Sequence, residues 1–361
     1  MIGPEPILPA MTDAVVVGVL YPPEWYRDQD GFAREVASLD AIDGVSVVVE
    51  SYVEPHELRS ARGKPDAGAL ADKAPALTNA QRAAFGQIDV ALAIDLPFEV
   101  HTVAPNLRWV QAVGAGTGQL QSSGLADAGI RLTAAVGTSA VSMAEFVLAR
   151  VLEDLKRLRE LEAAQARHHW EPLYGRQLAG RTIGLIGLGA INRAVAVRSR
   201  PLGLRVLATR RSAVPGSTDP DVDELYPASE LKTMLGQCDI VVAAVPETPE
   251  TVRLMDEAAF AAMPAGSFFC NVGRGSAVDE PALIAALRDG HLRATALDVA
   301  SVEPLPADNP LWDAPNLYLS PHCSTSPDAL FANLHVLFRD NLERFREGRP
   351  LLNEVDLTRG Y

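Results

Sequence analysis

The sequence predicts an α/β protein with two doubly wound parallel-sheet domains. Short runs of β-branched and other apolar residues alternate along the chain with longer stretches of helical periodicity, which is typical of parallel strands joined by crossover helices. A glycine-rich turn directly follows one of these runs and opens a helix. The chain has 361 residues, and single cores stop growing at roughly 250–300 residues, so two domains are expected.

The first part of the chain contains four candidate strands and two candidate helices. The strands are Val15–Leu20, Val45–Val49, Val90–Ile94 and Trp109–Val113. Glu24–Leu39 has the periodicity of a helix between the first two strands, so these strands are expected to be parallel. A long amphipathic helix is predicted from Ser142. Its apolar stripe is Ala144, Val147, Val151, Leu155 and Leu158.

After a connector at His168–Trp170, a second series of strands and helices follows. Its strands are Thr182–Ile186, Arg205–Ala208, Ile240–Val245, Ser267–Val272 and Thr295–Val299. The helix before the last of them has clear ends, because Asp279 is a suitable N-cap and Gly290 a suitable C-terminal glycine. A final helix is predicted at about Pro327–Glu347.

Composition limits the partners that this chain can have. It carries 32 Lys and Arg against 46 Asp and Glu, a formal net charge of −14, which disfavours nucleic acid and anionic membranes as partners. Only four of the cations are lysines. Cys238, Cys270 and Cys323 form neither a disulfide framework nor a metal-site pattern, which indicates a reducing, cytoplasmic location and no metal. Met1–Asp13 is predicted to be a flexible lead-in rather than a signal peptide.

The strongest local motif is the glycine turn Gly187-Leu-Gly189-Ala-Ile-Asn192 between a strand and a helix. In a dinucleotide-binding unit Gly187 makes the tight turn, and Gly189 lets the backbone approach a pyrophosphate at the helix N-terminus. Asn192 stands where Gly or Ala is usual, so its amide either widens the turn or contacts phosphate. A purely structural strand-to-helix turn is the alternative interpretation.

The end of the next strand favours NADP(H) over NAD(H). NAD-specific units place Asp or Glu there, to accept hydrogen bonds from the ribose hydroxyls. This chain instead has Arg210, Arg211 and Ser212, two guanidiniums and a hydroxyl that suit a 2′-phosphate. NAD(H) stays possible, because the two arginines could also belong to a solvated loop.

Three further segments connect the chain to a family. They are Asn271–Gly275, Asp298–Leu305 and Ser320–His322. Together with the glycine turn they resemble the D-isomer-specific 2-hydroxyacid dehydrogenases, the group that includes the glyoxylate/hydroxypyruvate reductases. The resemblance runs from about Asn106 onward and is strongest over Gly180–His322.

The resemblance implies a catalytic set of Arg274, Glu303 and His322. Arg274 would bind the substrate carboxylate, His322 would exchange a proton with the carbonyl oxygen, and Glu303 would orient the imidazole. Hydride would pass directly between nicotinamide and substrate, without a metal. Each residue alone also has a structural explanation: an ion pair for Arg274, a loop charge for Glu303 and a turn residue for His322.

The resemblance also implies further contacts around these residues. Backbone N–H groups at about Val113 and Gly114 would bind the substrate carboxylate, although this segment could also be a plain tight turn. Asp298 would contact the nicotinamide carboxamide, or could equally be a cap. The additional cofactor-binding positions are Ala190, Ile191, Pro246, Thr251, Val272 and Asp298.

The implied architecture is a flavodoxin-like substrate domain, residues 1–138 plus 323–361, and a Rossmann cofactor domain, residues 139–322. The implied assembly is a homodimer with the helix after Ser142 and the segment His168–Trp170 at the interface. The expected function is hydride transfer between NADP(H) and a small 2-oxo acid or D-2-hydroxy acid, of the glyoxylate/hydroxypyruvate type.

Three alternatives remain for the function. One is an NAD-linked dehydrogenase of the same family that acts on another 2-hydroxy acid. Another is a dinucleotide-sensing binding protein on the same fold, and the third is a Rossmann-type methyltransferase. The presence of Arg274, Glu303 and His322 together argues against the sensor and the methyltransferase, because neither needs this set.

Overall fold

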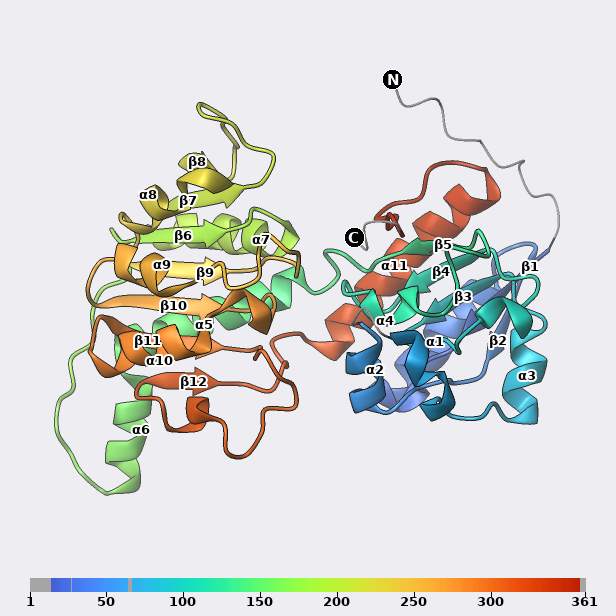
Figure 1. Ribbon diagram of the computed structural model, residues 1–361, viewed down its shortest axis with the longest axis horizontal. Helices are drawn as coiled ribbons and strands as arrows, with labels where there is room; N and C mark the ends of the chain where they lie inside the picture. The colour runs from blue at the N-terminus through green and yellow to red at the C-terminus, as the bar shows by residue number, and fades with distance from the viewer. Residues whose placement is uncertain (1–13, 27, 64–66, 358–361) are drawn as a thin grey trace. The chain divides into compact units, whose positions relative to one another are not determined.

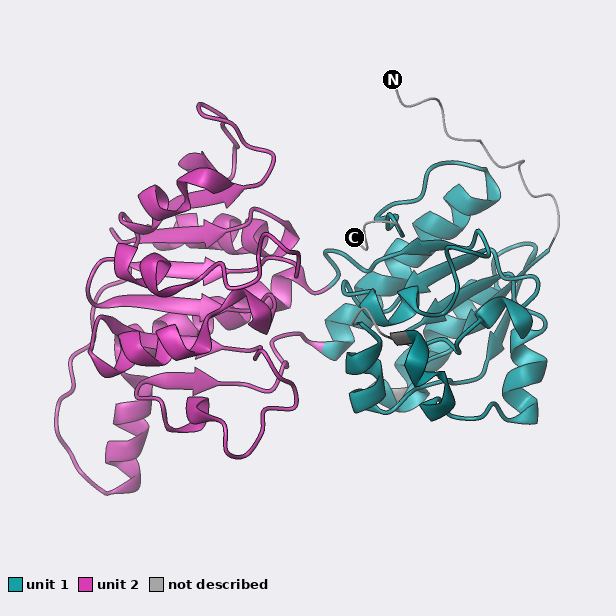
Figure 2. Ribbon diagram, viewed as in Figure 1, with its two compact units in different colours: residues 1–138, 327–361 teal, residues 139–326 magenta. Residues whose placement is uncertain are grey.

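The computed structural model describes residues 14–26, 28–63 and 67–357, so the predicted lead-in Met1–Asp13 lies outside the described residues. The chain divides into two compact units (Figure 2). Unit 1 comprises residues 1–138 and 327–361, and unit 2 comprises residues 139–326.

The chain returns to unit 1 at residue 327, four residues later than the expected return at 323. Hydrogen bonds explain the difference. The N–H groups of Cys323 and Ser324 donate to the carboxylate of Asp298, at 3.0 Å each. The N–H of Ser326 donates to Ser142 Oγ at 3.2 Å. These contacts attach residues 323–326 to unit 2.

Unit 1 is built on a five-stranded parallel sheet in the order β2-β1-β3-β4-β5 (Figure 1). Its strands are β1 Val15–Val19, β2 Val45–Val49, β3 Val90–Ala93, β4 Trp109–Ala112 and β5 Arg131–Thr133. Its helices are α1 Gln29–Asp40, α2 His56–Arg62, α3 Asn79–Phe85, α4 Gly118–Gln121 and α11 Pro327–Arg346. The order is that of flavodoxin-like doubly wound sheets, as expected for this unit.

The helix predicted over Glu24–Leu39 is wrong at its start. Pro23–Trp25 forms a short 3₁₀ helix, and Tyr26 then takes an extended conformation with φ −80° and ψ 131°. The α-helix α1 begins only at Gln29, after Asp28, whose carboxylate accepts the N–H of Asp30 at 3.1 Å. A capping carboxylate therefore starts this helix, as N-cap propensities favour.

The C-terminal helix α11 belongs to unit 1 because it covers one face of that sheet with aromatic residues. Phe338 stacks on Trp109 of β4, with ring centroids 5.1 Å apart. Phe331 stacks on Tyr21 and Tyr26, which follow β1, at 5.2 and 4.5 Å. All five side chains are buried, so the last helix of the sequence completes the core of the first strands.

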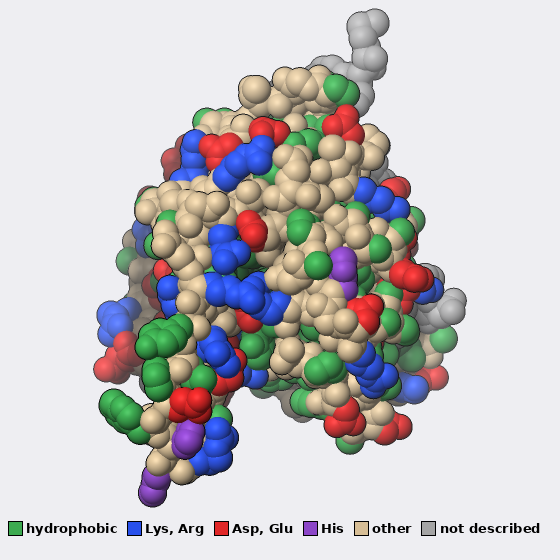
Figure 3. Space-filling model, turned by 90° about the vertical axis from the view of Figure 1, so that its left-hand side faces the viewer, with side chains coloured by type: hydrophobic (Ala, Val, Ile, Leu, Met, Phe, Trp, Pro, Cys, Tyr) green, Lys and Arg blue, Asp and Glu red, His purple; other side chains and the backbone are tan. Residues whose placement is uncertain are grey.

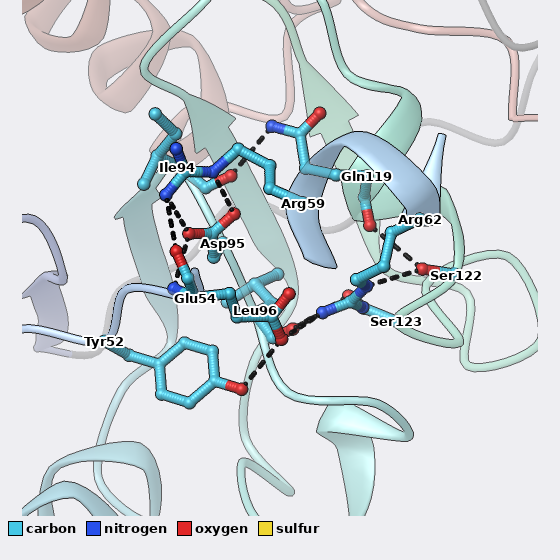
Figure 4. A network of polar contacts seen from close by, with 10 residues as sticks. All are labelled: Tyr52, Glu54, Arg59, Arg62, Ile94, Asp95, Leu96, Gln119, Ser122 and Ser123. Atoms are coloured by element: carbon cyan, nitrogen blue, oxygen red, sulfur yellow. Dashed lines mark hydrogen bonds and ion pairs between the residues drawn. The ribbon is translucent and has the colours of Figure 1, made fainter. Parts of the chain in front are cut away.

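A buried network of charged groups fastens α2 to the loops that follow β2, β3 and α4 (Figure 4). Arg62 Nη1 lies 2.5 Å from Glu54 Oε1, and both side chains are completely buried. Arg59 binds both carboxylate oxygens of Asp95 at 2.6 and 2.8 Å. Arg62 Nη2 also donates to Ser123 Oγ at 2.7 Å. Loss of one partner from such a buried pair leaves the other charge unpaired, at a cost of about 3–5 kcal/mol, so unit 1 depends on both partners for its stability.

His335 of α11 gives unit 1 a stability that depends on pH. Its side chain is 1% exposed, with Nε2 2.9 Å from Tyr21 Oη and Nδ1 3.7 Å from Glu35 Oε2. Burial, aided by the charge of Arg339, lowers the pKa of His335 to about 4. Below about pH 6.5 the unfolded chain therefore takes up a proton that the folded chain excludes.

We expect the free energy of unfolding to fall by about 3 kcal/mol through His335 as the pH drops from about 7 to about 4. Urea unfolding of the wild type and of His335→Gln across this range would measure the difference. Glutamine keeps a partner for Tyr21 but does not titrate, so the variant should lose less stability than the wild type. Equal losses in both proteins would contradict the assignment.

Unit 2 is built on a seven-stranded parallel sheet in the order β12-β11-β10-β9-β6-β7-β8 (Figure 1). Its strands are β6 Thr182–Ile186, β7 Arg205–Arg210, β8 Glu224–Pro227, β9 Ile240–Ala243, β10 Ser267–Asn271, β11 Leu292–Leu297 and β12 Leu317–Leu319. Its helices are α5 Ala140–Lys156, α6 Leu158–Ala166, α7 Ala190–Ser199, α8 Leu231–Leu235, α9 Glu257–Ala262 and α10 Glu280–Arg288. Counted within the unit, this is the 3-2-1-4-5-6 order of a Rossmann sheet with one added strand.

The long helix predicted from Ser142 is interrupted. Helix α5 ends at Lys156, because Arg157 takes a left-handed conformation with φ 57°, and α6 starts at the next residue. Leu158 is 42% exposed and does not continue the buried stripe, so that part of the prediction is wrong. The predicted cap of α10 is confirmed, since the Asp279 carboxylate accepts the N–H of Ala282.

Among the helices of residues 14–26, 28–63 and 67–357, none is both long and apolar enough to cross a membrane.

Candidate active site

The glycine turn lies between β6 and α7, and two of its positions depend on having no side chain. Gly187 has φ +81°, and a Cβ on it would lie 2.7 Å from Val245 Cγ1, so no other residue fits without a shift. Its N–H donates to Thr209 Oγ1 of β7 at 3.2 Å. Gly189 is the N-cap of α7, and apart from its own neighbours in the chain no atom of the described residues lies within 4 Å of the place where a Cβ would be. The first turn of α7, with Ala190 and Ile191, therefore opens onto free space that suits a phosphate.

Asn192 tightens this turn rather than widening it. Its side chain is completely buried, and Nδ2 donates to the carbonyl oxygens of Ile186 and Gly187 at 2.9 and 2.7 Å. The amide nitrogen thus ties the helix to the end of β6, where a glycine would have allowed direct packing. The buried Oδ1 has no hydrogen-bond partner among the described residues. The residues of this turn fit a dinucleotide pyrophosphate.

The arginines at the end of β7 have acidic neighbours that sequence reasoning missed. Arg210 is the last residue of β7, with its side chain 49% exposed and Nη1 3.9 Å from Asp219 Oδ2. Asp219 lies on the β7–β8 loop, where Arg193 of α7 binds both of its carboxylate oxygens. This contact holds the pKa of Asp219 below its usual range. Asp219 and Asp221 can be found in the sequence on either side of Pro220. Only the folded loop shows that Asp219 lies close to Arg210.

The other two residues of the predicted phosphate site follow Arg210 directly. Arg211 and Ser212 lie in the exposed turn after β7. The charge of Arg211 contributes to lowering the pKa of Glu250, after hydrogen bonds from Thr248 and from backbone. Glu250 belongs to the segment after β9, so this segment lies near the end of β7.

The remaining predicted cofactor positions lie after β9 and β10, on the same edge of the sheet as the glycine turn. The hydroxyl of Thr251 donates to the carbonyl of Pro246 at 2.6 Å and accepts the N–H of Thr248 at 2.8 Å. These bonds close the segment after β9 into a compact turn. Val272 follows β10, is 1% exposed, and donates its N–H to the carbonyl of Ala243. Because β6, β9 and β10 are neighbours, these positions cluster at one carboxyl edge.

Two glycines bring Arg274 to that edge. A Cβ on Gly273 would lie 2.8 Å from the backbone of Val245, and a Cβ on Gly275 would lie 1.9 Å from the carbonyl carbon of Ala300. The loop after β10 therefore packs directly against the loops after β9 and β11. The sequence motif contained both glycines, but their steric role became visible only in the structure. Arg274 Nη1 donates to the carbonyl of Gly273 at 2.8 Å.

Glu303 and His322 form a hydrogen-bonded pair. His322 Nδ1 lies 2.8 Å from Glu303 Oε2, with the side chains 51% and 27% exposed. Burial raises the pKa of Glu303, but hydrogen bonds from His322 and from Ala300 N–H, with the charges of His322 and Arg274, leave it below its usual range. Glu303 is thus an ionised partner that holds Nδ1, which leaves Nε2 to exchange a proton with a ligand.

Asp298 positions the backbone of His322. His322 has a left-handed conformation with φ 51°, and its N–H donates to the carbonyls of Asp298 and Ser320 at 2.8 and 3.1 Å. The Asp298 side chain is 1% exposed and accepts the Ser320 hydroxyl at 2.7 Å, besides the N–H groups of residues 323 and 324. Asp298 therefore caps backbone N–H groups, which is one of the two roles that the sequence analysis considered for it. Its contact with the nicotinamide stays a prediction.

The predicted carboxylate-binding turn lies in unit 1, after β4. Val113 donates its N–H to the carbonyl of Ala93 at 3.0 Å, which extends the pairing of β3 and β4. This N–H is not available to a substrate, which corrects the expectation for Val113. The N–H of Gly114 forms no hydrogen bond with the part of the chain that the structure describes, and its carbonyl accepts the N–H of Ala135.

The residues of unit 2 therefore combine three chemical abilities at one sheet edge. The first turn of α7 can receive a phosphate, the Arg274 guanidinium can bind a carboxylate, and the His322–Glu303 pair can move a proton. Among the described residues, no group of three or more His, Cys, Asp or Glu side chains is placed to bind a metal ion.

A family model matches most of unit 2. The model described as "D-isomer specific 2-hydroxyacid dehydrogenase, NAD binding domain" matches residues 148–324. This range contains the glycine turn, Arg274, Glu303 and His322.

Individual proteins are also similar to this chain. Glyoxylate/hydroxypyruvate reductase A of Yersinia enterocolitica is 29% identical over 283 residues, which cover 76% of this chain and 88% of that protein. D-3-phosphoglycerate dehydrogenase of Archaeoglobus fulgidus is 30% identical over 267 residues, 72% of this chain. The match spans only 49% of the length of that phosphoglycerate dehydrogenase.

Among solved structures, a similar one is the NADPH-dependent glyoxylate/hydroxypyruvate reductase of Sinorhizobium meliloti in complex with NADP and sulfate. It superposes with a TM-score of 0.73 at 28% identity, and the match covers 97% of this chain and all of that one. The likeness therefore extends over both units.

Proposed function

Because this chain belongs to the D-isomer-specific 2-hydroxyacid dehydrogenase family, we propose that it transfers a hydride between NADP(H) and a small 2-oxo acid or D-2-hydroxy acid. The observation that carries the proposal is the 2.8 Å contact between His322 Nδ1 and Glu303 Oε2. This pair lies near Arg274, at the sheet edge that also carries the glycine turn.

Each residue of the catalytic set has a role that its surroundings support. Arg274 binds the carboxylate of the 2-oxo acid, for which a planar guanidinium provides two parallel donors. His322 gives a proton from Nε2 to the carbonyl oxygen during reduction and takes it back during oxidation. Glu303 fixes the orientation of the imidazole through its contact with Nδ1. A bound nicotinamide supplies the hydride, or accepts it in the reverse direction.

NADP(H) is the proposed cofactor because of the residues after β7. Arg210, Arg211 and Ser212 supply two cations and a hydroxyl where NAD-specific units carry a carboxylate. The Sinorhizobium reductase, which is similar over both units, was solved with NADP. An NAD-linked dehydrogenase for another 2-hydroxy acid is the second candidate, favoured by the likeness to phosphoglycerate dehydrogenase and by Asp219 beside Arg210.

The proposed substrates are glyoxylate and hydroxypyruvate. Two of the similar proteins are named as reductases of these acids, and both are matched over most of their length. Both acids are small and carry one carboxylate beside the carbonyl, which suits a site with Arg274 as its carboxylate ligand.

We expect the purified chain to oxidise NADPH when glyoxylate or hydroxypyruvate is added. The decrease in NADPH absorbance measures this reaction. A panel of 2-oxo acids tested with NADPH and with NADH would rank the substrates and the cofactors together. Faster turnover with NADH on a different 2-oxo acid would favour the second candidate. Dinucleotide binding without turnover of any 2-oxo acid would contradict the enzyme assignment and indicate a sensor.

We infer a homodimer in which α5, α6 and the segment His168–Trp170 take part in the interface. Large apolar side chains are exposed on α6 and on the segment after it; they are Leu158, Leu161, Trp170 and Tyr174. Trp170 is fully exposed and Tyr174 is 84% exposed. Figure 3 shows apolar, histidine and charged side chains together at the lower left of the view. Light scattering that gives the mass of one chain would contradict the dimer.

A cytoplasmic location stays a prediction from the sequence. It is compatible with the three cysteines, which are all free thiols: Cys238 and Cys270 are buried, and Cys323 is exposed. Small organic acids are the proposed partners, and the net charge of −14 continues to argue against polyanions.

A further inference from the structure

The β7–β8 loop holds a carboxylate firmly beside the proposed phosphate-binding arginines. Arg193 of α7 donates from Nη1 to Asp219 Oδ1 at 2.9 Å and from Nη2 to Asp219 Oδ2 at 2.8 Å. Asp221, two residues further on, binds the same Nη1. The Asp219 side chain is only 8% exposed, whereas the Arg193 side chain is 37% exposed, so water reaches this pair from the arginine side only.

Asp219 also faces Arg210, one of the two arginines that would meet a 2′-phosphate. The distance from Asp219 Oδ2 to Arg210 Nη1 is 3.9 Å. Asp219 Oδ1 additionally accepts the N–H of Asp221 at 3.1 Å. With two partners besides Arg210, the carboxylate is fixed in place and cannot swing away when an anion binds to Arg210.

The charges around this position balance. Two guanidiniums and two carboxylates are joined by ion pairs: Arg193 and Arg210, and Asp219 and Asp221. The two arginines after β7 are therefore not a doubly positive site. A phosphate brings about −1.5 to −2 charges at neutral pH, whereas a free ribose hydroxyl brings none. The carboxylate of Asp219, fixed beside Arg210, therefore repels the 2′-phosphate, a group that only the phosphorylated dinucleotide carries.

We propose that Asp219 is a specificity-determining residue: its carboxylate, fixed by Arg193 beside Arg210, weakens the binding of a 2′-phosphorylated dinucleotide and leaves the non-phosphorylated one unaffected. The inference rests on the proposed function, because it takes a dinucleotide site at the end of β7 as given. It implies that this chain discriminates between NADPH and NADH less than its two arginines alone would allow.

The test is Asp219→Asn in the full-length chain, with binding of NADPH and NADH measured by nicotinamide fluorescence in the absence of any 2-oxo acid. Asparagine keeps the size of the side chain and an oxygen for the N–H of Asp221, but removes the charge. We expect the Kd for NADPH to fall about fivefold to tenfold at low ionic strength, and the Kd for NADH to stay the same. The gain should shrink in about 1 M salt, where the screening length is only about 3 Å.

Asp221→Asn is the matched comparison. Asp221 shares the partner Arg193 but has no ion pair with Arg210, so its replacement should lower the Kd for NADPH less. An equal gain in both variants would overturn the assignment to Asp219, because the effect would then pass through Arg193. Weaker NADPH binding by Asp219→Asn would also overturn it, since the carboxylate would then orient Arg210 for the phosphate.

The proposed function and this inference fail in different ways. If the wild type binds neither reduced dinucleotide, the proposed function is overturned and the inference with it. If the wild type binds them and Asp219→Asn leaves the ratio of the two Kd values unchanged, only the inference is overturned. Thermal unfolding of all three proteins identifies a variant that loses binding through misfolding, and a misfolded Asp219→Asn can be replaced by Asp219→Ser in the same comparison.

Discussion

Replacement of His322 by asparagine is expected to lower kcat by about 10²–10⁴-fold, because the reaction loses its proton donor at the carbonyl oxygen. The affinity for the dinucleotide should stay close to that of the wild type, because the glycine turn and the proposed phosphate site follow β6 and β7, whereas His322 follows the edge strand β12. Stopped-flow or steady-state assays would give kcat, and nicotinamide fluorescence would give the dinucleotide Kd. The two measurements separate a chemical defect from a binding defect.

His101→Asn is a suitable control for this experiment. His101 also faces a glutamate, with Nδ1 3.7 Å from Glu99 Oε2, but it lies on the surface of unit 1 and has no proposed role. Its replacement should leave kcat unchanged. Turnover by His322→Asn near the wild-type rate would remove the acid/base role from this residue, whatever the control shows.

Replacement of Arg274 by lysine is expected to lower kcat/KM for the 2-oxo acid by about 10²-fold or more, which corresponds to about 3 kcal/mol. Lysine keeps the positive charge but is a point charge without the planar pair of donors that a carboxylate accepts. It would also lose the bond from Arg274 Nη1 to the carbonyl of Gly273 that holds the side chain. The decrease in kcat/KM should be seen mainly when the concentration of the 2-oxo acid is varied. The dinucleotide Kd should change little.

Arg288→Lys provides the matched control for Arg274→Lys. Arg288 is exposed at the end of α10, and its replacement makes the same chemical change outside the site. It should leave kcat/KM as in the wild type. An Arg274→Lys enzyme with full kcat/KM would show that a carboxylate is not bound there by a guanidinium.

The interior strands could be predicted from the sequence, whereas three of the four edge strands, β5, β8 and β12, could not. The fourth edge strand, β2, was predicted because its sequence is rich in valine. Strands such as β9 and β10 are buried on both faces and therefore read as continuous apolar runs. The edge strand β8 contains Glu224 and exposes part of its length, so it has no such run. The break between α5 and α6 was missed because Arg157 interrupts the helix without a glycine or proline to mark the place.

The position of a candidate site residue in the fold could be predicted where the residue follows a strand directly, and not where a loop must fold back. Arg274 and His322 stand next to strand ends, so the topology brings them to one edge once the strands are identified. Asp219 lies nine residues after Arg210 in sequence, and only the folded loop places it 3.9 Å away. The reason that position 275 must be glycine could likewise not be predicted. It depends on the close approach of Ala300, which lies 25 residues further along the chain.

The cations that this chain directs toward its proposed ligands are arginines, and this choice affects its chemical reactivity. Primary amines condense with aldehydes and ketones to form imines, whereas guanidiniums stay protonated and are poor nucleophiles under the same conditions. The sequence has four lysines, and the ammonium of Lys156 already donates to the carbonyl of Arg176. Glyoxylate is an aldehyde, so an enzyme that binds it would have few lysine amines with which this substrate could form imines. Reagents that acylate lysine should correspondingly spare the site, and dicarbonyl reagents that attack arginine should inactivate it.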